Sequence, residues 1–386
     1  MPVTLERKPL FDALRLLRQV APGRNTIPIL SNVRLRTEGD TLQVTATDLD
    51  RWLTATIEVT DQDEPMDLTV QTARLSAFVS ALPNGAEIRL TERPKTRRLD
   101  VAAGTARQQI ATLPSEDWPT AKLDDLPEIE VEAPLLHRLL ALPSTAVGVD
   151  ETKPYLHGVH MVAREGGLSA VATDGHVLVH LPTGLPEALG ACAALRTGIT
   201  VPTGTVQLLA GMLAGQQTAS MTLSDRLLCV SAGNLHLVSR LADSTFPDFR
   251  RILPARQDDP PTVDRAALLE AAKRCGISGD HVSSTGRSPG RSIHIAQEGA
   301  ELVLSGRDDV GAAWERLPAT GILPDSFGLN PAYLDRILHM ATGERVEIHL
   351  IAADTAVRLV DPGDPAVDRI VMPVRTAAPQ PDEAEA

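Results

Sequence analysis

One pattern occurs three times along this chain of 386 residues, and no other feature constrains the fold as strongly. The phrase Val44–Asp48 (VTATD) returns as Ala170–Asp174 (AVATD), and a looser version returns as Val303–Asp308 (VLSGRD). The aspartates that end these phrases lie 126 and then 134 residues apart. Because a third of the chain is about 129 residues, the sequence predicts three copies of one domain with almost nothing left over.

A second phrase supports the same period. Pro114–Pro119 (PSEDWP) returns as Leu241–Pro247 (LADSTFP), with the aromatic-proline pair displaced by 128 residues. We therefore expect domains at 1–122, 128–254 and 259–375, which are called copies 1, 2 and 3 below. The remaining residues, 376–386, are rich in Pro, Ala, Asp and Glu, so we expect a disordered acidic tail there.

Each copy has the same predicted order of elements, with two helices and several alternating strands. The first helices are expected to start near Arg7, Glu132 and Asp264, where a proline or a capping carboxylate precedes apolar residues at helical spacing. The second helices are expected at 72–82, 202–213 and 330–340. Runs such as Thr41–Thr45 and Glu347–Ile351 alternate apolar and polar residues, as strands with one solvent-exposed face do. The predicted fold class is α+β with antiparallel sheets.

Composition excludes several classes of protein. The N-terminal sequence has no apolar signal region, and no run approaches the length of a membrane span, so we expect a cytoplasmic protein without a membrane partner. The cysteines Cys192, Cys229 and Cys275 are far apart and odd in number, which is typical of small buried residues. Aromatic residues make up 3% of the chain, too few for the stacking surface of a single-strand binder.

The charge is unevenly distributed between the predicted helices and the rest of the chain. The whole chain carries −13, but the six predicted helices together carry +4, which leaves −17 for everything else. Duplex DNA is bound mainly through Lys and Arg at phosphates, so a basic helical face in an acidic protein is compatible with DNA. A difference of this size also arises by chance, and it gains meaning only beside the threefold repeat.

A metal-dependent hydrolase is the strongest rival from another class, with Asp48, Asp50, Asp174 and His176 as ligands. Asp48 and Asp174, however, occupy matching positions of separate copies, which is typical of a recurrent structural turn. No glycine-rich phosphate loop or paired acid-base motif accompanies them. We therefore expect no metal, no cofactor and no catalytic residues.

Several motifs resemble one known family over the length of the chain. They are Arg24 with Thr26–Asn32 (TIPILSN), Thr47–Leu49, Tyr155–Gly158 (YLHG), Ala172–His176 (ATDGH), Phe246–Pro254 (FPDFRRILP) and Val371–Arg375 (VMPVR). In order and spacing this set is similar to that of the bacterial replicative sliding clamp, the beta subunit of the DNA polymerase III holoenzyme.

The resemblance implies a head-to-tail homodimer that forms a ring of six domains, with helices lining a hole around duplex DNA and sheets outside. It implies a processivity factor for DNA replication that binds the replicative polymerase, the clamp loader and other proteins with clamp-binding motifs. A specialised second clamp that serves as a scaffold is the alternative within the same fold.

The resemblance also assigns residues to two sites. It places Arg24, Arg74, Lys153 and Tyr155 as contacts to DNA. It implies a peptide-binding pocket between copies 2 and 3, made of Leu156, Thr173, Gly175, His176, Val177, Leu178, Pro247, Arg251, Ile252, Ile370, Met372 and Pro373. Leu, Ile, Met and Pro offer an apolar surface, and Thr173, His176 and Arg251 supply groups that orient a peptide's polar atoms.

Overall fold

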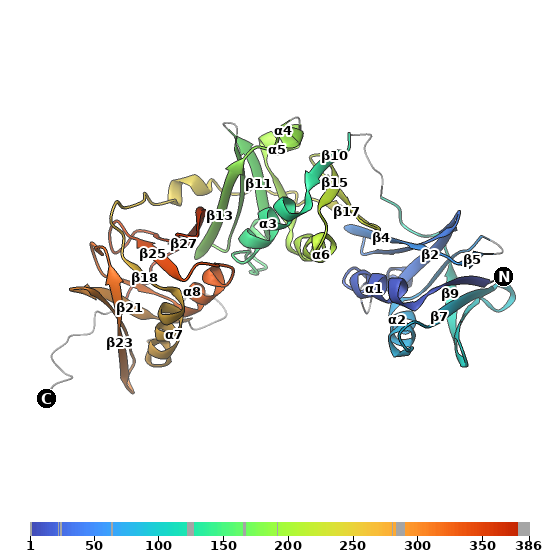
Figure 1. Ribbon diagram of the computed structural model, residues 1–386, viewed down its shortest axis with the longest axis horizontal. Helices are drawn as coiled ribbons and strands as arrows, with labels where there is room; N and C mark the ends of the chain where they lie inside the picture. Colours follow the sequence, from blue (N-terminus) through green and yellow to red (C-terminus); the bar gives the residue numbers. More distant parts are fainter. Residues whose placement is uncertain are drawn as a thin grey trace. The chain divides into compact units, whose positions relative to one another are not determined.

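Two continuous antiparallel sheets organise the chain, one in each of two units (Figure 1). The computed structural model describes residues 2–21, 23, 25–62, 65–121, 127–164, 167–190, 192–279, 281–282 and 290–376. Unit 1 consists of Met1–Arg138, Glu187–Ala194 and Gly204–Ala242. Unit 2 consists of Leu139–Pro186, Leu195–Thr203 and Asp243–Ala386. The predicted acidic tail, apart from Thr376, lies outside the described residues.

The sheet of unit 1 has 13 described strands. In spatial order they are β10 (Ile129–Glu132), β15 (Thr218–Leu223), β16 (Leu227–Ala232), β17 (Leu235–Arg240), β4 (Arg51–Glu58), β3 (Thr41–Thr47), β2 (Asn32–Glu38), β6 (Asp67–Gln71), β9 (Ala106–Pro114), β8 (Arg98–Ala103), β7 (Glu87–Arg93), β1 (Pro2–Glu6) and β5 (Asp61–Gln62). Strands of copies 1 and 2 meet at the β4–β17 ladder, where Trp52 lies opposite Val238.

The sheet of unit 2 has 12 described strands. Their order is β14 (Ile199–Pro202), β11 (Gly158–Arg164), β12 (Gly167–Thr173), β13 (Val177–Gly184), β27 (Asp364–Val371), β26 (Val357–Asp361), β25 (Arg345–His349), β18 (Thr262–Asp264), β23 (Ala312–Thr320), β22 (Glu301–Arg307), β21 (Ile293–Glu298) and β24 (Phe327–Leu329). A separate pair is formed by β19 (His281–Val282) and β20 (Gly290–Arg291). Copies 2 and 3 meet at the β13–β27 ladder, where Leu178 lies opposite Ile370.

The six predicted helices are confirmed within a few residues. The first helix of each copy is α1 (Arg7–Leu17), α3 (Ala133–Ser144) and α7 (Arg265–Cys275), and the second is α2 (Thr72–Ala81), α6 (Thr203–Leu213) and α8 (Pro331–Leu338). The predicted caps have a physical basis, because Asp264 accepts a hydrogen bond from the Ala267 amide at 2.7 Å and Asn330 from the Ala332 amide at 3.0 Å. Two short helices, α4 (Glu187–Gly190) and α5 (Ala193–Thr197), were not predicted.

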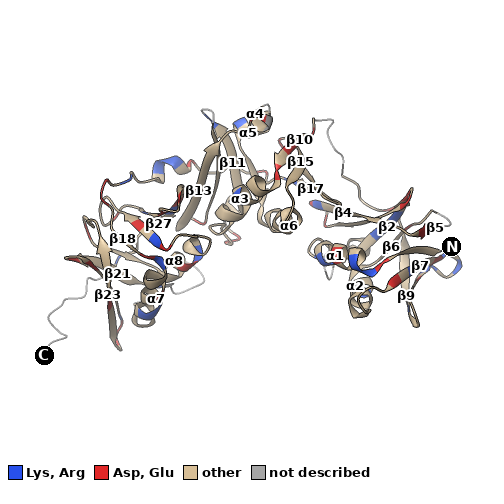
Figure 2. Ribbon diagram, in the orientation of Figure 1, with Lys and Arg blue, Asp and Glu red and all other residues tan. Residues whose placement is uncertain are grey.

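One residue counted in the helical charge turns inward. Arg7 on α1 is buried, and its guanidinium donates to the carbonyl oxygens of Val79 and Ser80 and to the side chain of Asn84. It therefore joins α1 to the end of α2 and is no part of a basic surface. Figure 2 shows other Lys and Arg residues on α1, α7 and α8.

Among the described residues, no helix combines the length and the apolar composition needed to cross a membrane.

Candidate peptide-binding site

The β13–β27 ladder brings together residues that are almost two hundred positions apart in the sequence. Val177 lies opposite Val371, and Leu178 lies opposite Ile370. One residue beyond the ladder, the Met372 amide donates a hydrogen bond of 2.8 Å to the carbonyl oxygen of His176. Six of the twelve predicted pocket residues lie on this ladder or in the turn that precedes it, and Met372 and Pro373 follow directly at its end.

An apolar cluster forms on one face of this ladder. Leu156, Leu178 and Ile370 are buried in it, and the half-buried Met372 packs against it. Its other members are Val162, Val171, Phe246, Phe249, Leu253 and Ala356. The sequence analysis did not place these six in the site, although Phe246 and Phe249 stand in one of the motifs that carry the resemblance. The aromatic rings were missed because side-chain directions in an irregular segment and in a short 3-10 helix cannot be read from sequence spacing.

The segment that carries Phe249 also carries exposed polar and apolar residues. It is the 3-10 helix η4 (Phe249–Ile252), and Phe249 faces the cluster while Arg251 and Ile252 are exposed. The Arg251 side chain is 85% exposed and its Nε lies 3.3 Å from Asp248. An exposed guanidinium held only by a surface ion pair can be recruited by a ligand at little cost. Pro247, just before η4, is exposed as well.

Thr173, Gly175 and His176 belong to the turn between β12 and β13. The Thr173 hydroxyl donates to the Val177 carbonyl oxygen at 2.6 Å and accepts from the Gly175 amide at 3.0 Å. Asp174 accepts from the amides of His176 and Val177 at 2.8 and 2.9 Å. Gly175 has φ = 93°, a left-handed conformation that favours glycine. The turn leaves the His176 side chain exposed beside the cluster.

Tyr333 on α8 is a further residue of this region that the sequence analysis missed. Its ring stacks on His176, with centroids 5.7 Å apart and an interplanar angle of 15°. Partial burial, followed by the nearby Asp174 carboxylate, raises the pKa of the Tyr333 hydroxyl. Tyrosine at this place presents an amphipathic ring to His176 and keeps its hydroxyl protonated.

His160 on β11 lies under the aromatic part of the cluster. Its ring stacks on Phe246 with centroids 4.6 Å apart and an interplanar angle of 5°, and its Nδ1 lies 3.1 Å from the Thr200 hydroxyl. Burial lowers the pKa of His160 to about 4, with a smaller contribution from the Arg164 charge. The imidazole is therefore neutral at pH 7 and acts as part of the packing.

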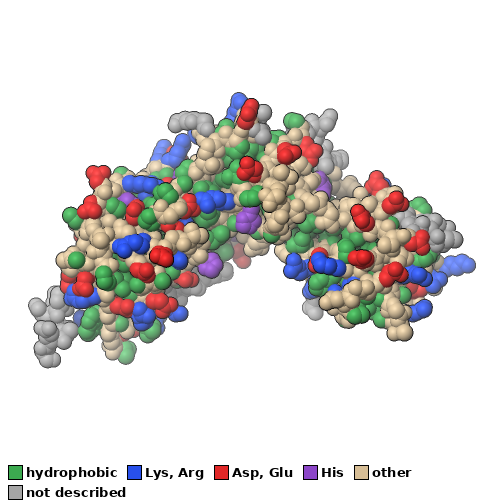
Figure 3. All heavy atoms as spheres, in the orientation of Figure 1, with side chains coloured by type: hydrophobic (Ala, Val, Ile, Leu, Met, Phe, Trp, Pro, Cys, Tyr) green, Lys and Arg blue, Asp and Glu red, His purple; other side chains and the backbone are tan. Residues whose placement is uncertain are grey.

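The four residues predicted to contact DNA come from three parts of the sequence, because Lys153 and Tyr155 are two positions apart. Arg74 is exposed on α2, where its Nε donates to the Gln71 side chain. Lys153 is half-buried and precedes the 3-10 helix η3 (Pro154–Leu156), on which Tyr155 is 37% exposed. Arg24 lies outside the described residues. Figure 3 shows further Lys and Arg side chains over α1 on one face of unit 1.

The aspartates of the rival metal site are turn residues. Asp48 Oδ1 accepts from the amides of Asp50 and Arg51, in the same way as Asp174 accepts from His176 and Val177, and Asp308 from Val310 and Gly311. The second oxygen of Asp48 binds Arg51, and that of Asp174 binds Arg336. Within the described residues, no three His, Cys, Asp or Glu side chains are grouped as a metal site would require. The geometry accounts for these aspartates as structural groups.

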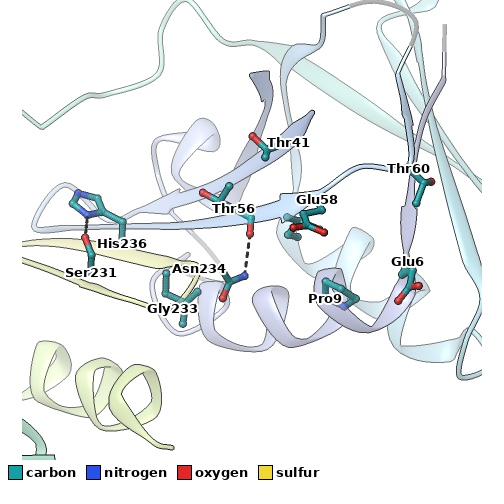
Figure 4. A pocket seen from close by; sticks show the side chains of 12 residues that line it. Glu6, Pro9, Thr41, Thr56, Glu58, Thr60, Ser231, Gly233, Asn234 and His236 are labelled. Carbon is teal, nitrogen blue, oxygen red and sulfur yellow. Dashed lines mark hydrogen bonds between the residues drawn. The ribbon is translucent and has the colours of Figure 1, made fainter. Parts of the chain in front are cut away.

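A separate pocket of about 700 Å³ lies in unit 1, beside the start of α1 (Figure 4). It is lined by Glu6, Pro9, Thr41, Thr56, Ile57, Glu58, Thr60, Ser231, Gly233, Asn234, Leu235 and His236. The Asn234 side chain closes one wall by donating to the Thr56 carbonyl oxygen at 3.0 Å. Two carboxylates and no Lys or Arg line it, so its charge disfavours phosphate and DNA, and no predicted site residue lies in it.

Comparisons with known proteins identify the family. The model of the DNA polymerase III beta subunit N-terminal domain matches residues 1–123, and the model of its central domain matches residues 130–248. The beta sliding clamp of Caulobacter vibrioides is 31% identical over 97% of this chain and 100% of the relative. That of Escherichia coli K12 is 28% identical, with the same coverage.

Solved structures agree with the sequence comparison. A crystal structure of the Caulobacter crescentus beta sliding clamp superimposes with a TM-score of 0.88 at 31% identity, covering 97% of this chain and 99% of the other. A Pseudomonas aeruginosa sliding clamp bound to griselimycin gives a TM-score of 0.88 at 28% identity, covering 97% and 100%. The chain therefore belongs to the family of bacterial beta sliding clamps, the beta subunits of DNA polymerase III.

Proposed function

We propose that this chain closes into a ring with a second copy of itself, encircles duplex DNA, and tethers the replicative polymerase there. Sliding clamps are non-catalytic processivity factors, and the chain shares that function as a member of the family. The observation that carries the ring is an unfilled sheet edge in copy 1 and another in copy 3.

The two unfilled edges belong to strands of copies 1 and 3. The matching strands of the other copies pair with a strand of a neighbouring copy. β4 and β13 each follow the repeated aspartate turn, and each pairs with a strand of the next copy. β23 follows the third such turn, yet in the described chain Ala312–Pro318 pairs only with β22. At the other end, Ala106–Ala111 of β9 pairs, among the described strands, only with β8. A partner chain fills both edges if its β9 pairs with β23.

The β4–β17 junction, whose hairpin is regular like that of β8 and β9, also predicts the register of that pairing. Trp52 and Leu178 stand four residues after Asp48 and Asp174, and their counterpart after Asp308 is Ala312. Val238 stands five residues after the hairpin glycine Gly233, and the counterpart after Gly104 is Gln109. We therefore expect Ala312 opposite Gln109 of the partner chain. Trp314, which is 60% exposed, then lies opposite Arg107, a geometry that favours cation–π contact.

Disulfide cross-linking tests the dimer and its register. Gln109→Cys together with Ala312→Cys should give a covalent dimer on mild oxidation, because directly opposed residues of antiparallel strands are close enough to bridge. Gln109→Cys with Ala313→Cys is the matched control, since neighbouring residues face opposite sides of a sheet. The native cysteines are buried, so wild-type protein should stay uncross-linked. Equal cross-linking of both pairs would refute the register, and a monomer in light scattering would refute the ring.

DNA would be held by the closed ring around it and by a few Lys and Arg side chains. We propose Arg24, Arg74, Lys153 and Tyr155 as contacts, with the helices α1, α2, α3, α6, α7 and α8 lining the hole. Lys8 and Arg74 are exposed on their helices, which supports this orientation. Contacts to phosphate without base readout suit a protein that slides, because they carry no sequence preference.

Retention on circular DNA tests encirclement. After loading onto a nicked circle by the host's clamp loader, the protein should stay bound through gel filtration. Linearisation by a restriction enzyme should release it, because a ring runs off a free end. Retention on both forms would show ordinary binding and would overturn the proposal.

The apolar cluster at β13–β27 would bind short peptides of the polymerase, the clamp loader and other proteins that carry clamp-binding motifs. The half-buried Met372 and the exposed Ile252 supply accessible apolar groups beside the buried Leu156, Leu178 and Ile370, and His176 and Arg251 supply exposed polar groups. The Caulobacter crescentus structure has PEG at a beta-motif tethering region, and a Pseudomonas aeruginosa clamp binds griselimycin. Griselimycin is therefore a suitable probe for this chain.

Domain boundaries and location complete the proposal. We propose that the three clamp domains occupy 1–122, 128–254 and 259–375, and that the protein works in the cytoplasm at the replication fork. The family-model matches at 1–123 and 130–248 support the first two ranges.

A further inference from the structure

One arginine of copy 3 is bound to three acceptors in copy 2. Arg336 on α8 donates through Nε to the carbonyl oxygen of Thr145, through one terminal nitrogen to Asp174, and through the other to the carbonyl oxygen of Val147 at 2.7 Å. The side chain is 32% exposed and the Asp174 side chain 16%. A guanidinium presents its donors in a rigid fork, so these three bonds fix its position.

The carboxylate that Arg336 binds also organises the turn beside the apolar cluster. Asp174 Oδ2 accepts from Arg336, and its Oδ1 accepts from the amides of His176 and Val177. The chain passes through a left-handed conformation at Gly175, between these groups. A single carboxylate thus connects α8 of copy 3 to the backbone of two predicted pocket residues.

The same helix holds the turn at a second point. Tyr333 stands three residues before Arg336, on the same side of α8, and stacks on the His176 ring. The turn between β12 and β13 is therefore held from outside its own copy by a charge-assisted hydrogen bond and by a ring contact.

We propose that Arg336 is a positioning residue for peptide binding. It would fix the turn, and with it His176 and Val177, in the conformation that a peptide requires, while lying outside the apolar cluster. This proposal rests on the peptide site proposed above. Binding to a preformed site avoids the cost of ordering it. If only about a tenth of the molecules hold the turn correctly without Arg336, the apparent Kd rises about tenfold.

The test uses Arg336→Gln, Asp174→Asn and the double variant in the full-length protein. The probes are griselimycin and a fluorescein-labelled peptide from the C-terminus of the host polymerase's catalytic subunit. Both single variants should weaken binding of the probes about tenfold, and the double variant should be no weaker than the worse single one, because both changes remove one connection. Additive effects in the double variant would contradict the proposed link.

A matched control separates positioning from general destabilisation. Arg34 forms a bidentate pair with Asp67, at 2.7 and 2.6 Å, with a 19% exposed side chain, in a different copy. Arg34→Gln should lower the melting temperature about as much as Arg336→Gln and leave peptide binding unchanged. Hydrogen exchange at the His176 and Val177 amides should be faster in Arg336→Gln than in the wild type and unchanged in Arg34→Gln. If Arg336→Gln does not fold, Arg336→Lys, which keeps the charge but loses the fork, takes its place.

Two negative outcomes are distinguishable. Wild-type affinity and unchanged amide exchange in Arg336→Gln would overturn the role of Arg336 and leave the peptide site standing. Absence of binding by the wild-type protein itself would overturn the peptide site, and the role of Arg336 with it.

Discussion

The β4–β17 and β13–β27 junctions share a pattern of strand pairing but carry different side chains at matching positions. In both, a strand that follows an aspartate turn pairs with a strand of the next copy, and the residue four positions after the aspartate lies opposite an apolar residue, Trp52 opposite Val238 and Leu178 opposite Ile370. At the first junction, Trp52 is only 8% exposed, packs on Cys229, Val238 and neighbouring residues, and donates from Nε1 to the Pro119 carbonyl oxygen at 3.0 Å.

The second junction has smaller side chains at the matching positions. Leu178 replaces the indole of Trp52, and the half-buried Met372 stands where the first junction has Arg240, which is 62% exposed and 3.9 Å from Asp50. The two junctions thus share their pattern of strand pairing and differ in the size and polarity of two matched side chains, and we propose that this difference suits the second junction for binding a peptide. Three predictions test this explanation.

Removal of the indole should have the largest effect. Trp52→Ala deletes a buried side chain and leaves a cavity, so we expect the free energy of unfolding to fall by about 3–5 kcal/mol. Trp52→Phe keeps most of the volume but loses the bond to Pro119, which should cost about 1 kcal/mol. Urea unfolding followed by circular dichroism measures both. If Trp52→Ala lowered the free energy of unfolding by less than Trp52→Phe does, the indole would not fill this junction.

Lowering the pH should reduce the free energy of unfolding through His160 at the second junction. The expected loss lies between those of the other two predictions. The pKa of His160 is lowered from 6.5 to about 4 in the folded protein, so the unfolded chain binds a proton first as pH falls. Stability from the neutral ring is therefore complete above pH 6.5 and lost progressively towards pH 4, by about 3 kcal/mol. Urea unfolding at pH 7.5 and 4.5 measures the loss.

His160→Gln is the control for this pH dependence, since it removes the titrating ring. The difference in unfolding free energy between the two pH values should shrink by about 2.5 kcal/mol in this variant. The same difference in variant and wild type would mean that other groups cause it. At the matching place in copy 1 stands Arg34, whose pair with Asp67 involves no group that titrates near neutral pH.

Truncation at the open surface should affect binding more than folding. Met372→Ala and Arg251→Ala should each weaken the labelled polymerase peptide about tenfold, or ~1.4 kcal/mol, because each removes a partner at the edge of the apolar cluster. Arg240→Ala, at the position in the first junction that corresponds to Met372, is the matched control. Fluorescence anisotropy gives the affinities, and light scattering should show intact dimers. Unchanged affinity in both test variants would remove the peptide site.

The fold could be read from the sequence because its signals are local and repeated. Caps such as Asp264 and Asn330 mark the helix starts, and the aspartate turns mark the strand starts in each copy. The inward direction of Arg7 was not predicted, because its partners lie at the far end of α2. Long-range partners of this kind leave no local signal.

The candidate site was predicted only in part, because some of its residues have local sequence motifs and others are brought in by long-range contacts. The motifs that carry the family resemblance contain Thr173–Leu178 and Ile370–Pro373 or lie beside them, and strand pairing brings these segments together. Tyr333 and Arg336 lie on a helix of copy 3, and only the three-dimensional structure shows that they contact a turn of copy 2. A pair such as Arg336 and Asp174, 162 residues apart, has no spacing rule that predicts it.

The free edge of β9 has a consequence for the separated subunit. An unpaired strand edge is a template for unwanted association, and proteins blunt such edges with charged and polar residues. The edge at Ala106–Ala111 carries Arg107, Gln108 and Gln109 in sequence, and Arg107 and Gln109 are exposed. In the proposed ring, opening would expose this strand to water, and its polar composition would disfavour aggregation of the separated subunit.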